Sequence, residues 1–185
     1  CPHRSSRYRS PRFPVAEPIA VLVAARNEAE RIGSTVEQLR EQFPSADVIV
    51  ADDGSTDGTA ETAERAGARV LRLPARGKGQ ALTLAEREAP PGALVVCDAV
   101  LAGDLRPLAA AEGGLAIAVF AERQGGGFGI AKSAARTLIR ARSGFVPAEP
   151  LSGQRVFSAD ARAVCFPLAA GFGCGVGASN EAARA

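Results

Sequence analysis

Charged and amide side chains follow each of four short apolar runs in the first hundred residues of the chain. They are Arg26, Asn27 and Glu28 after the first run, Asp52 and Asp53 after the second, Arg76 and Lys78 after the third, and Asp98 after the fourth. Carboxylates accept hydrogen bonds from the N–H groups of a base and from ribose hydroxyls, whereas lysine and arginine offset the charge of a diphosphate. If the four runs end at one edge of a sheet, this mixture favours a cleft that binds a sugar nucleotide.

The elements that must position these side chains alternate along the chain. Continuous apolar runs predict strands at residues 19–25, 47–51, 68–73 and 93–98. Helical spacing predicts helices at residues 28–43, 58–67 and 79–89, the second capped by Asp57 and ended by Gly67. This alternation predicts an α/β fold with a mainly parallel, Rossmann-like sheet and helices on both faces. In such open sheets ligands bind outside the carboxyl ends of the strands.

Two common nucleotide-binding motifs are absent from the sequence. No GxGxxG follows the first run, which argues against a dinucleotide site. The segment "RGKGQA" lacks the spacing and the Ser or Thr of a phosphate-binding P-loop. The glycines on both sides of Lys78 would still let a ligand approach the backbone closely.

Length and composition are those of one soluble globular domain with a core. The net charge of +2 points to no particular partner, and we expect no nucleic acid. Residues 1–17 are predicted to be a basic flexible tail, and weak contact with a membrane surface or another polyanion is the alternative. No apolar run reaches the roughly 18–20 residues of a membrane span, so we expect a cytoplasmic protein, at most peripheral to the membrane.

The cysteines and the single histidine argue against two further kinds of site. Cys1, Cys97, Cys165 and Cys174 have no CxxC spacing, which predicts reduced and mostly buried thiols rather than disulfides or a zinc site. The histidine, His3, lies in the tail, which argues against histidine-based catalysis. The chain begins with a cysteine and contains no methionine, so we expect that its natural start is missing.

The second half of the sequence is less regular. "LAIAVFAER" at residues 115–123 predicts another strand, and residues 131–144 predict a helix with a basic face. That face would meet phosphate-bearing acceptors or lipid headgroups, or simply solvent. "GGGFG" at residues 125–129 fits either a loop that orders over a bound donor or a linker.

Four motifs carry a resemblance to a known family. "VLVAARNEAERI", "VIVADDGSTDGT", "GKGQAL" and "VVCDA", in this order, resemble the donor half of a family 2 glycosyltransferase with the GT-A fold. The later "PLSGQRVF" and "GFGCGVG" resemble the small bacterial enzymes related to glucosyl-3-phosphoglycerate synthase. The resemblance covers residues 19–185 and implies a GT-A-type sheet. It also implies a nucleotide-binding half at 18–105 and an acceptor half at 106–185 that is incomplete at its C-terminal end.

The resemblance implies a role for each matching position. The residues that would bind the nucleotide sugar are Ala24, Ala25, Arg26, Glu28, Asp53, Lys78, Asp98 and Ala99. Among them Asp53 would contact the base, and Asp98 would hold ribose or metal-bound phosphate. The residues that would lie on the acceptor side are Leu151, Ser152, Gly153, Gln154 and Arg155. Simpler interpretations remain open, since Glu28 could be a first-turn helix acid and Arg155 a surface charge.

The family implies a divalent cation, Mg²⁺ or Mn²⁺, but the sequence departs from the pattern that would bind it. Val100 stands where the last acid of an Asp-X-Asp motif would supply oxygen ligands. Gly175 stands where related sequences have a glutamate, and no late histidine follows it. Asp98 alone would be a weak ligand, and Asp104 could join it only if the loop folds back. The sequence therefore predicts an impaired metal site.

The function that follows is transfer of a sugar from a UDP- or GDP-sugar to a hydroxyl acceptor, either a small phosphorylated molecule or a lipid phosphate. One alternative is a glycosyltransferase-like domain that binds a nucleotide sugar with impaired or absent catalysis. Another is a nucleotidyltransferase, which is disfavoured because "AARNEAERIG" replaces the glycine-rich loop of those enzymes. No catalytic base is evident, and a homodimer is left open.

Overall fold

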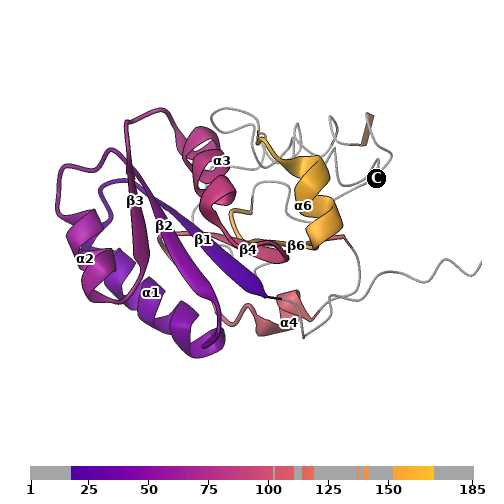
Figure 1. Ribbon diagram of the computed structural model, residues 1–185, viewed down its shortest axis with the longest axis horizontal. Helices are drawn as coiled ribbons and strands as arrows, with labels where there is room; N and C mark the ends of the chain where they lie inside the picture. The colour runs from indigo at the N-terminus through magenta and orange to yellow at the C-terminus, as the bar shows by residue number, and fades with distance from the viewer. Residues whose placement is uncertain are drawn as a thin grey trace, which may run out of the picture.

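The computed structural model describes residues 18–101, 103–110, 114–118, 137, 140–141 and 152–168 (Figure 1). Its strands are β1 (Ile19–Ala25), β2 (Asp47–Asp53), β3 (Arg69–Leu73), β4 (Ala93–Asp98), β5 (Leu115–Ile117) and β6 (Arg155–Phe157). Its helices are α1 (Ala29–Gln42), α2 (Thr59–Arg65), α3 (Lys78–Glu88), α4 (Arg106–Ala109) and α6 (Ala159–Cys165). The elements from β1 to β4 are those expected from the sequence, with ends that differ by two residues at most.

The six strands described form one sheet in the order β3-β2-β1-β4-β6-β5. Strands β1 to β4 pair in parallel, whereas β6 lies antiparallel between β4 and β5. The predicted mainly parallel α/β sheet is therefore confirmed. The chain moves outward from β1 through β2 to β3 and then returns to place β4 on the other side of β1. The strand order thus switches between β1 and β4, where open α/β sheets bind their ligands.

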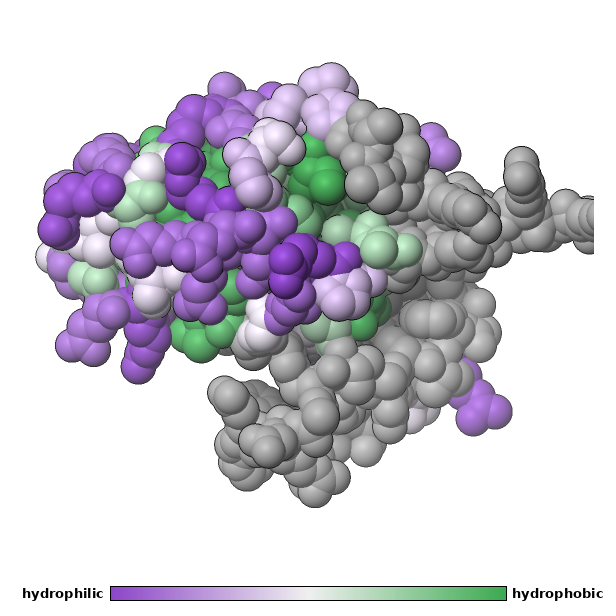
Figure 2. All heavy atoms as spheres, turned by 90° about the horizontal axis from the view of Figure 1, so that it is seen from below, coloured by the Kyte–Doolittle hydropathy of each residue, from purple (hydrophilic) through white to green (hydrophobic). Residues whose placement is uncertain are grey.

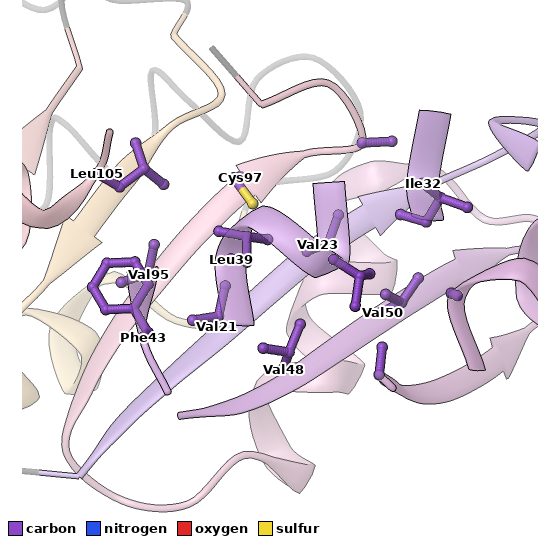
Figure 3. Close-up of a cluster of buried hydrophobic side chains, with 14 of the residues drawn as sticks. Val21, Val23, Ile32, Leu39, Phe43, Val48, Val50, Val95, Cys97 and Leu105 are labelled. Carbon is purple, nitrogen blue, oxygen red and sulfur yellow. The ribbon is translucent and has the colours of Figure 1, made fainter. Parts of the chain in front are cut away.

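Helices cover both faces of the sheet, which explains why its central strands have uninterrupted apolar runs (Figure 1). On one face, Val21 and Val23 of β1 pack in a cluster with Ile32 and Leu39 of α1 (Figure 3). On the other face, Leu22 of β1 packs in a cluster with residues of α3 and α6. Successive strand residues point to opposite faces, so each strand contributes to both cores.

The outer surface of the described part is mostly hydrophilic. Figure 2 shows the molecule from below the view of Figure 1, and hydrophilic residues predominate over that face with small hydrophobic patches between them. Among the described residues, the exposed large hydrophobic side chains are Val100 and Val164. Within the same residues, no helix is both long and apolar enough to cross a membrane.

The second half differs from expectation in several elements. The strand predicted at 115–123 ends at Ile117, and residues 119–123 lie outside the described residues. Strand β6 and helix α6 were not predicted. The three residues of β6 are too few to show a pattern, and the seven residues of α6 form only about two turns. In the helix predicted at 131–144, residues 137, 140 and 141 are helical and exposed, and the rest is not described. The tail, "GGGFG" and residues 169–185 also lie outside the described part.

The prediction of buried thiols holds where the structure describes them. Cys97 in β4 is completely buried in the core beside α1, and Cys165 of α6 is also buried. Burial raises the pKa of the Cys97 thiol far above its ordinary value, so it stays protonated and is no nucleophile. Cys1 and Cys174 lie outside the described residues.

The prediction that Asp57 caps the helix after it holds for its hydrogen bond, but Asp57 does not occupy the N-cap position. The N-cap position of α2 is Gly58, in the left-handed region with φ 81° and no side-chain cap. The Asp57 side chain still accepts a hydrogen bond from the backbone N–H of Thr59, the first residue of α2 (3.2 Å). The other carboxylate oxygen accepts from the backbone N–H of Ala29, the first residue of α1 (3.2 Å). The Thr59 hydroxyl holds the pKa of the Asp57 carboxyl below its usual range. Asp57 therefore fastens the start of α1 to the loop before α2.

Replacing Thr59 with valine is expected to lower the free energy of unfolding by about 1–3 kcal/mol, because a partly buried backbone donor loses its acceptor. Thr59 is fully buried, and its hydroxyl accepts a hydrogen bond from the backbone N–H of Glu28 at 2.8 Å. Urea denaturation measures the change. The matched control is Thr62→Val on the same helix, whose hydroxyl accepts from the exposed Arg65. Equal denaturation midpoints for the two variants would contradict the assignment.

Candidate functional site

The residues expected to do chemistry lie at the carboxyl ends of β1, β2 and β4. In the sheet register Ala24 of β1 is paired with Asp98 of β4, and Ala25 with Asp52 of β2. The switch point between β1 and β4 therefore brings the first loop of the chain next to Asp98. This edge of the sheet is the candidate site.

Asp53 holds the loop that leads to Lys78. Its carboxylate is buried and accepts hydrogen bonds from the backbone N–H groups of Arg76 (2.8 Å) and Gly77 (3.0 and 3.1 Å). Gly77 has φ 94°, a conformation that favours glycine, and Lys78 follows as the first residue of α3. Sequence reasoning missed this positioning role, although a glycine directly before a helix start was a signal for it.

Lys78 and Asp98 form an ion pair across the site, between Nζ and Oδ1. Lys78 comes from the start of α3 and Asp98 from the end of β4, so two separate elements fix the pair. Their side chains are 35% and 47% exposed, which leaves both accessible to a ligand from solvent. The sequence placed each residue at the same edge, and the structure shows that they are paired.

The predicted acceptor loop touches Asp98 directly. A Cβ atom added to Gly153 would overlap the Asp98 carboxylate, so the backbone of this loop lies against the end of β4. The neighbouring Gln154 is buried and its Nε2 donates to the carbonyl of Val100 at 3.3 Å. Its Oε1 is buried, and among the described residues it has no hydrogen-bond partner. These contacts join the end of β4 to the loop that the sequence predicted on the acceptor side.

Arg155 is not a surface charge, which settles one of the open alternatives. It is 3% exposed and lies at the start of β6. Its Nε donates to the carbonyl of Ser152, itself buried, at 2.9 Å. Arg155 therefore ties the residues on the two sides of Gly153 together. Leu151, the remaining residue of the predicted acceptor set, lies outside the described residues.

The first loop is tied to the loop after β2 by Asn27. Its Oδ1 accepts from the backbone N–H of Thr56, and its own N–H donates to the Ser55 hydroxyl, both at 2.9 Å. Asn27 has φ 55°, which asparagine tolerates better than most residues. Its neighbour Arg26 is exposed, whereas Glu28 forms an ion pair with Arg31 of its own helix at 3.0 Å. In this structure Glu28 thus behaves as an acid of the helix start.

The residue after Asp98 is held against helix α1 by a hydrogen bond. Ala99 is buried, and its carbonyl accepts a hydrogen bond from the Thr35 hydroxyl of α1 at 2.7 Å. The next residue, Val100, is 47% exposed at the position where the family pattern has an acid. The position is therefore open to solvent but carries no oxygen ligand.

The described residues do not form a binding shell for Mg²⁺ or Mn²⁺, which require several oxygen ligands. Within them no cluster of three or more His, Cys, Asp or Glu side chains has the geometry to hold a metal ion. Asp104 is bonded through both carboxylate oxygens to Arg106, which holds the pKa of that carboxyl below its usual range. The idea that Asp104 completes a metal shell therefore gains no support, because its oxygens are committed to Arg106. Asp98 is paired with Lys78.

A small hollow of about 160 Å³ lies beside this edge, and neither Lys78 nor Asp98 lines it. Its lining residues are Asp52, Gly54, Ser55, Gly58, Thr59, Ala60, Glu61, Arg72 and Leu73. Ligand pockets usually enclose about 300–1,000 Å³, so a ligand as large as a nucleotide sugar would extend across the open edge rather than fill this hollow.

Comparison with known proteins gives a consistent result for the first half of the chain. Residues 20–99 match the model of the family described as Glycosyl transferase family 2. Glycosyltransferase AglJ from Haloferax volcanii is 43% identical over 70 residues, which are 38% of this chain and 23% of that protein. Protein RfbJ from Shigella flexneri is 41% identical over 61 residues, which are 33% of this chain and 47% of that protein. The chain therefore matches less than half the length of these curated relatives.

Solved structures extend the likeness beyond the first half. Glucosyl-3-phosphoglycerate synthase from Mycobacterium tuberculosis, in complex with Mn²⁺, uridine-diphosphate-glucose and phosphoglyceric acid, superimposes with a TM-score of 0.72 and 28% identity. The match covers 88% of this chain and 64% of that one. The same enzyme with phosphoglyceric acid gives a TM-score of 0.71 and 29% identity. The fold and family resemblance inferred from the motifs are confirmed.

Proposed function

We propose that this protein transfers a sugar from a nucleotide-sugar donor to a hydroxyl acceptor, because residues 20–99 match the family 2 glycosyltransferase model and the fold resembles that of a glycosyltransferase of known structure. The reaction releases a nucleoside diphosphate and a proton. The observation that carries the proposal is the Lys78–Asp98 pair at the switch point, with Gly153 of the acceptor loop against it. In this proposal the donor and the acceptor meet at this pair.

We propose a UDP-sugar as the donor and a small phosphorylated molecule as the acceptor. The mycobacterial synthase binds uridine-diphosphate-glucose and phosphoglyceric acid, and its structure covers most of this chain. In this assignment the nucleotide lies over residues 18–105 and the acceptor over residues 106–185. Ala24, Ala25 and Arg26 line the uridine pocket, and Asp53 lies beneath the same edge.

The proposal is tested by calorimetric titration of UDP- and GDP-sugars, followed by an assay of sugar transfer to 3-phosphoglycerate. We expect UDP-sugars to bind more tightly than GDP-sugars and transfer to be detectable. A chain that is folded by circular dichroism but binds neither nucleotide would refute the proposal.

One observation favours a second candidate, a domain that binds the donor without transfer. Val100 replaces an acid at an exposed position, and the described residues offer no cation cluster. Both candidates expect donor binding, so binding does not separate them. Product formation does, since a pure binding domain would hold the UDP-sugar intact during prolonged incubation with acceptor.

Replacing Asp53 with asparagine is expected to weaken UDP binding about tenfold, because the amide replaces one acceptor oxygen of the charged group that holds the Lys78 loop. The matched control is Asp52→Asn, a buried neighbour that accepts from the Ser55 N–H at 3.1 Å. Uridine separates two roles for Asp53. If Asp53 contacts the base, uridine binding also falls, whereas a loop-positioning role leaves uridine affinity unchanged. Unaltered UDP affinity would remove Asp53 from the site.

A further inference from the structure

We propose that the Lys78 ammonium takes the place of the divalent cation at the donor diphosphate, so that this protein binds nucleoside diphosphates without metal. The inference rests on the proposed function, since it concerns the same donor site. It starts from two observations that disagree. The mycobacterial synthase was crystallised with Mn²⁺, whereas the described residues of this chain form no cation shell.

Among the described residues, four features leave a cation without the ligands that it requires. The Oδ1 atom of Asp98 is paired with Lys78 Nζ. Its Oδ2 atom faces the backbone at Gly153, where even a methyl group would overlap it. Val100 supplies no oxygen, and Asp104 is bound to Arg106. A hard cation at Asp98 would have to displace an ammonium already in contact with the carboxylate.

Asp53 and Asp98 hold the Lys78 ammonium in a position where it can contact a ligand. Asp53 accepts hydrogen bonds from the backbone of Arg76 and Gly77 directly before Lys78, so the position of the start of α3 is fixed. Asp98 then holds the Lys78 side chain at the end of β4. Two carboxylates thus position one cation, the first through the backbone and the second through the side chain. Less conformational entropy is lost when such a preplaced group binds its ligand.

The surroundings of Lys78 suit an anion. Helix α3 has 11 residues and carries no acid in its first turn, so the positive end of its dipole is not offset locally. Gly77 and Gly79 flank Lys78 and leave room for phosphate oxygens to approach the backbone. A diphosphate would therefore contact the Lys78 ammonium from its solvent side, while Asp98 keeps its contact with the same ammonium on the other side.

The first test compares UDP binding in EDTA with UDP binding in Mn²⁺ by calorimetry. The expected dissociation constants agree within twofold. An increase in UDP affinity of tenfold or more on adding Mn²⁺ would overturn the inference and leave the proposed function standing. Absence of UDP and GDP binding under both conditions would overturn the proposed function and the inference with it.

The second test uses variants at Lys78, measured in EDTA. Lys78→Met is expected to weaken UDP binding at least tenfold and to change uridine binding less than twofold, because uridine carries no phosphate. Lys78→Arg is expected to retain most of the UDP affinity. The matched control, Arg76→Met, removes an exposed cation of the same loop and is expected to weaken UDP less than threefold. Equal losses in Lys78→Met and Arg76→Met would overturn the inference, because they would show general charge attraction.

The third test restores the missing ligand. In the double variant Lys78→Met/Val100→Asp, Asp98 loses its ammonium partner and a second carboxylate is added at an exposed position. Mn²⁺ is expected to raise the UDP affinity of this variant at least tenfold, and electron paramagnetic resonance of Mn²⁺ reports the bound ion directly. Thermal melts establish that the variant is folded. A folded double variant that ignores Mn²⁺ would overturn the claim that Lys78 occupies the cation's place.

Discussion

Replacing Arg162 with methionine is expected to lower the free energy of unfolding by about 3–5 kcal/mol, because it leaves a largely buried carboxylate without its partner. Arg162 of α6 is 8% exposed, and its Nε donates to Glu86 Oε1 of α3 at 2.6 Å. Its Nη atoms donate to the carbonyls of Pro90 (2.6 Å), Glu86 (2.9 Å) and Ala89 (3.3 Å). One guanidinium thus satisfies the end of α3, where helix carbonyls lack intrahelical partners.

Urea denaturation measures this loss, and two further variants interpret it. Arg87→Met removes an exposed arginine from the same turn of α3 and is expected to change stability by less than about 0.5 kcal/mol. Glu86→Gln keeps an acceptor for Arg162 but removes the charge, so its loss is expected to lie between the other two. A loss below about 1 kcal/mol in Arg162→Met would show that the pair adds little to the packing of α6 on α3.

Arg162 also shows what the sequence did not reveal. It is 76 residues from Glu86, and nothing in "ADARAVC" distinguishes it from a solvated arginine. The first four strands could be predicted because apolar runs of five to seven residues between helices leave few alternatives. Strand β6 could not, because it has three residues and its pairing depends on a chain segment far away in the sequence.

The candidate site was predictable to the same extent as the topology. Parallel strands bring their carboxyl ends to one edge, so the sequence could place Asp53, Lys78 and Asp98 near each other. It could not show that Asp53 bonds the loop before Lys78, since the path of that loop depends on the φ of Gly77. The contact between Asp98 and Gly153 joins positions 55 residues apart, and no local pattern encodes it. Residue types and strand order thus give the members of the site, and the loops decide which members touch.

Replacing Gly153 with alanine is expected to weaken UDP binding at least tenfold and to cost about 1–3 kcal/mol of stability, the usual cost of overpacking. The added Cβ would overlap the Asp98 carboxylate, so either the acceptor loop moves or Asp98 turns away from Lys78. The matched control is Gly114→Ala, because a Cβ there would meet Ala161 at an ordinary 3.5 Å. Calorimetry with UDP and urea denaturation measure the two effects.

A double-mutant cycle with Asp98→Ala separates the clash from any other effect of Gly153→Ala. Removing the carboxylate creates room for the new methyl group, so Gly153→Ala is expected to cost at least about 1 kcal/mol less stability in the Asp98→Ala background. The same cost in both backgrounds would show that the two residues are not coupled. The proposed meeting of donor and acceptor sides at Asp98 would then lose its structural basis, because Gly153 is the described residue that brings the acceptor loop to the carboxylate. A positive coupling would instead explain why this loop requires a residue without a side chain directly beside the carboxylate that pairs with Lys78.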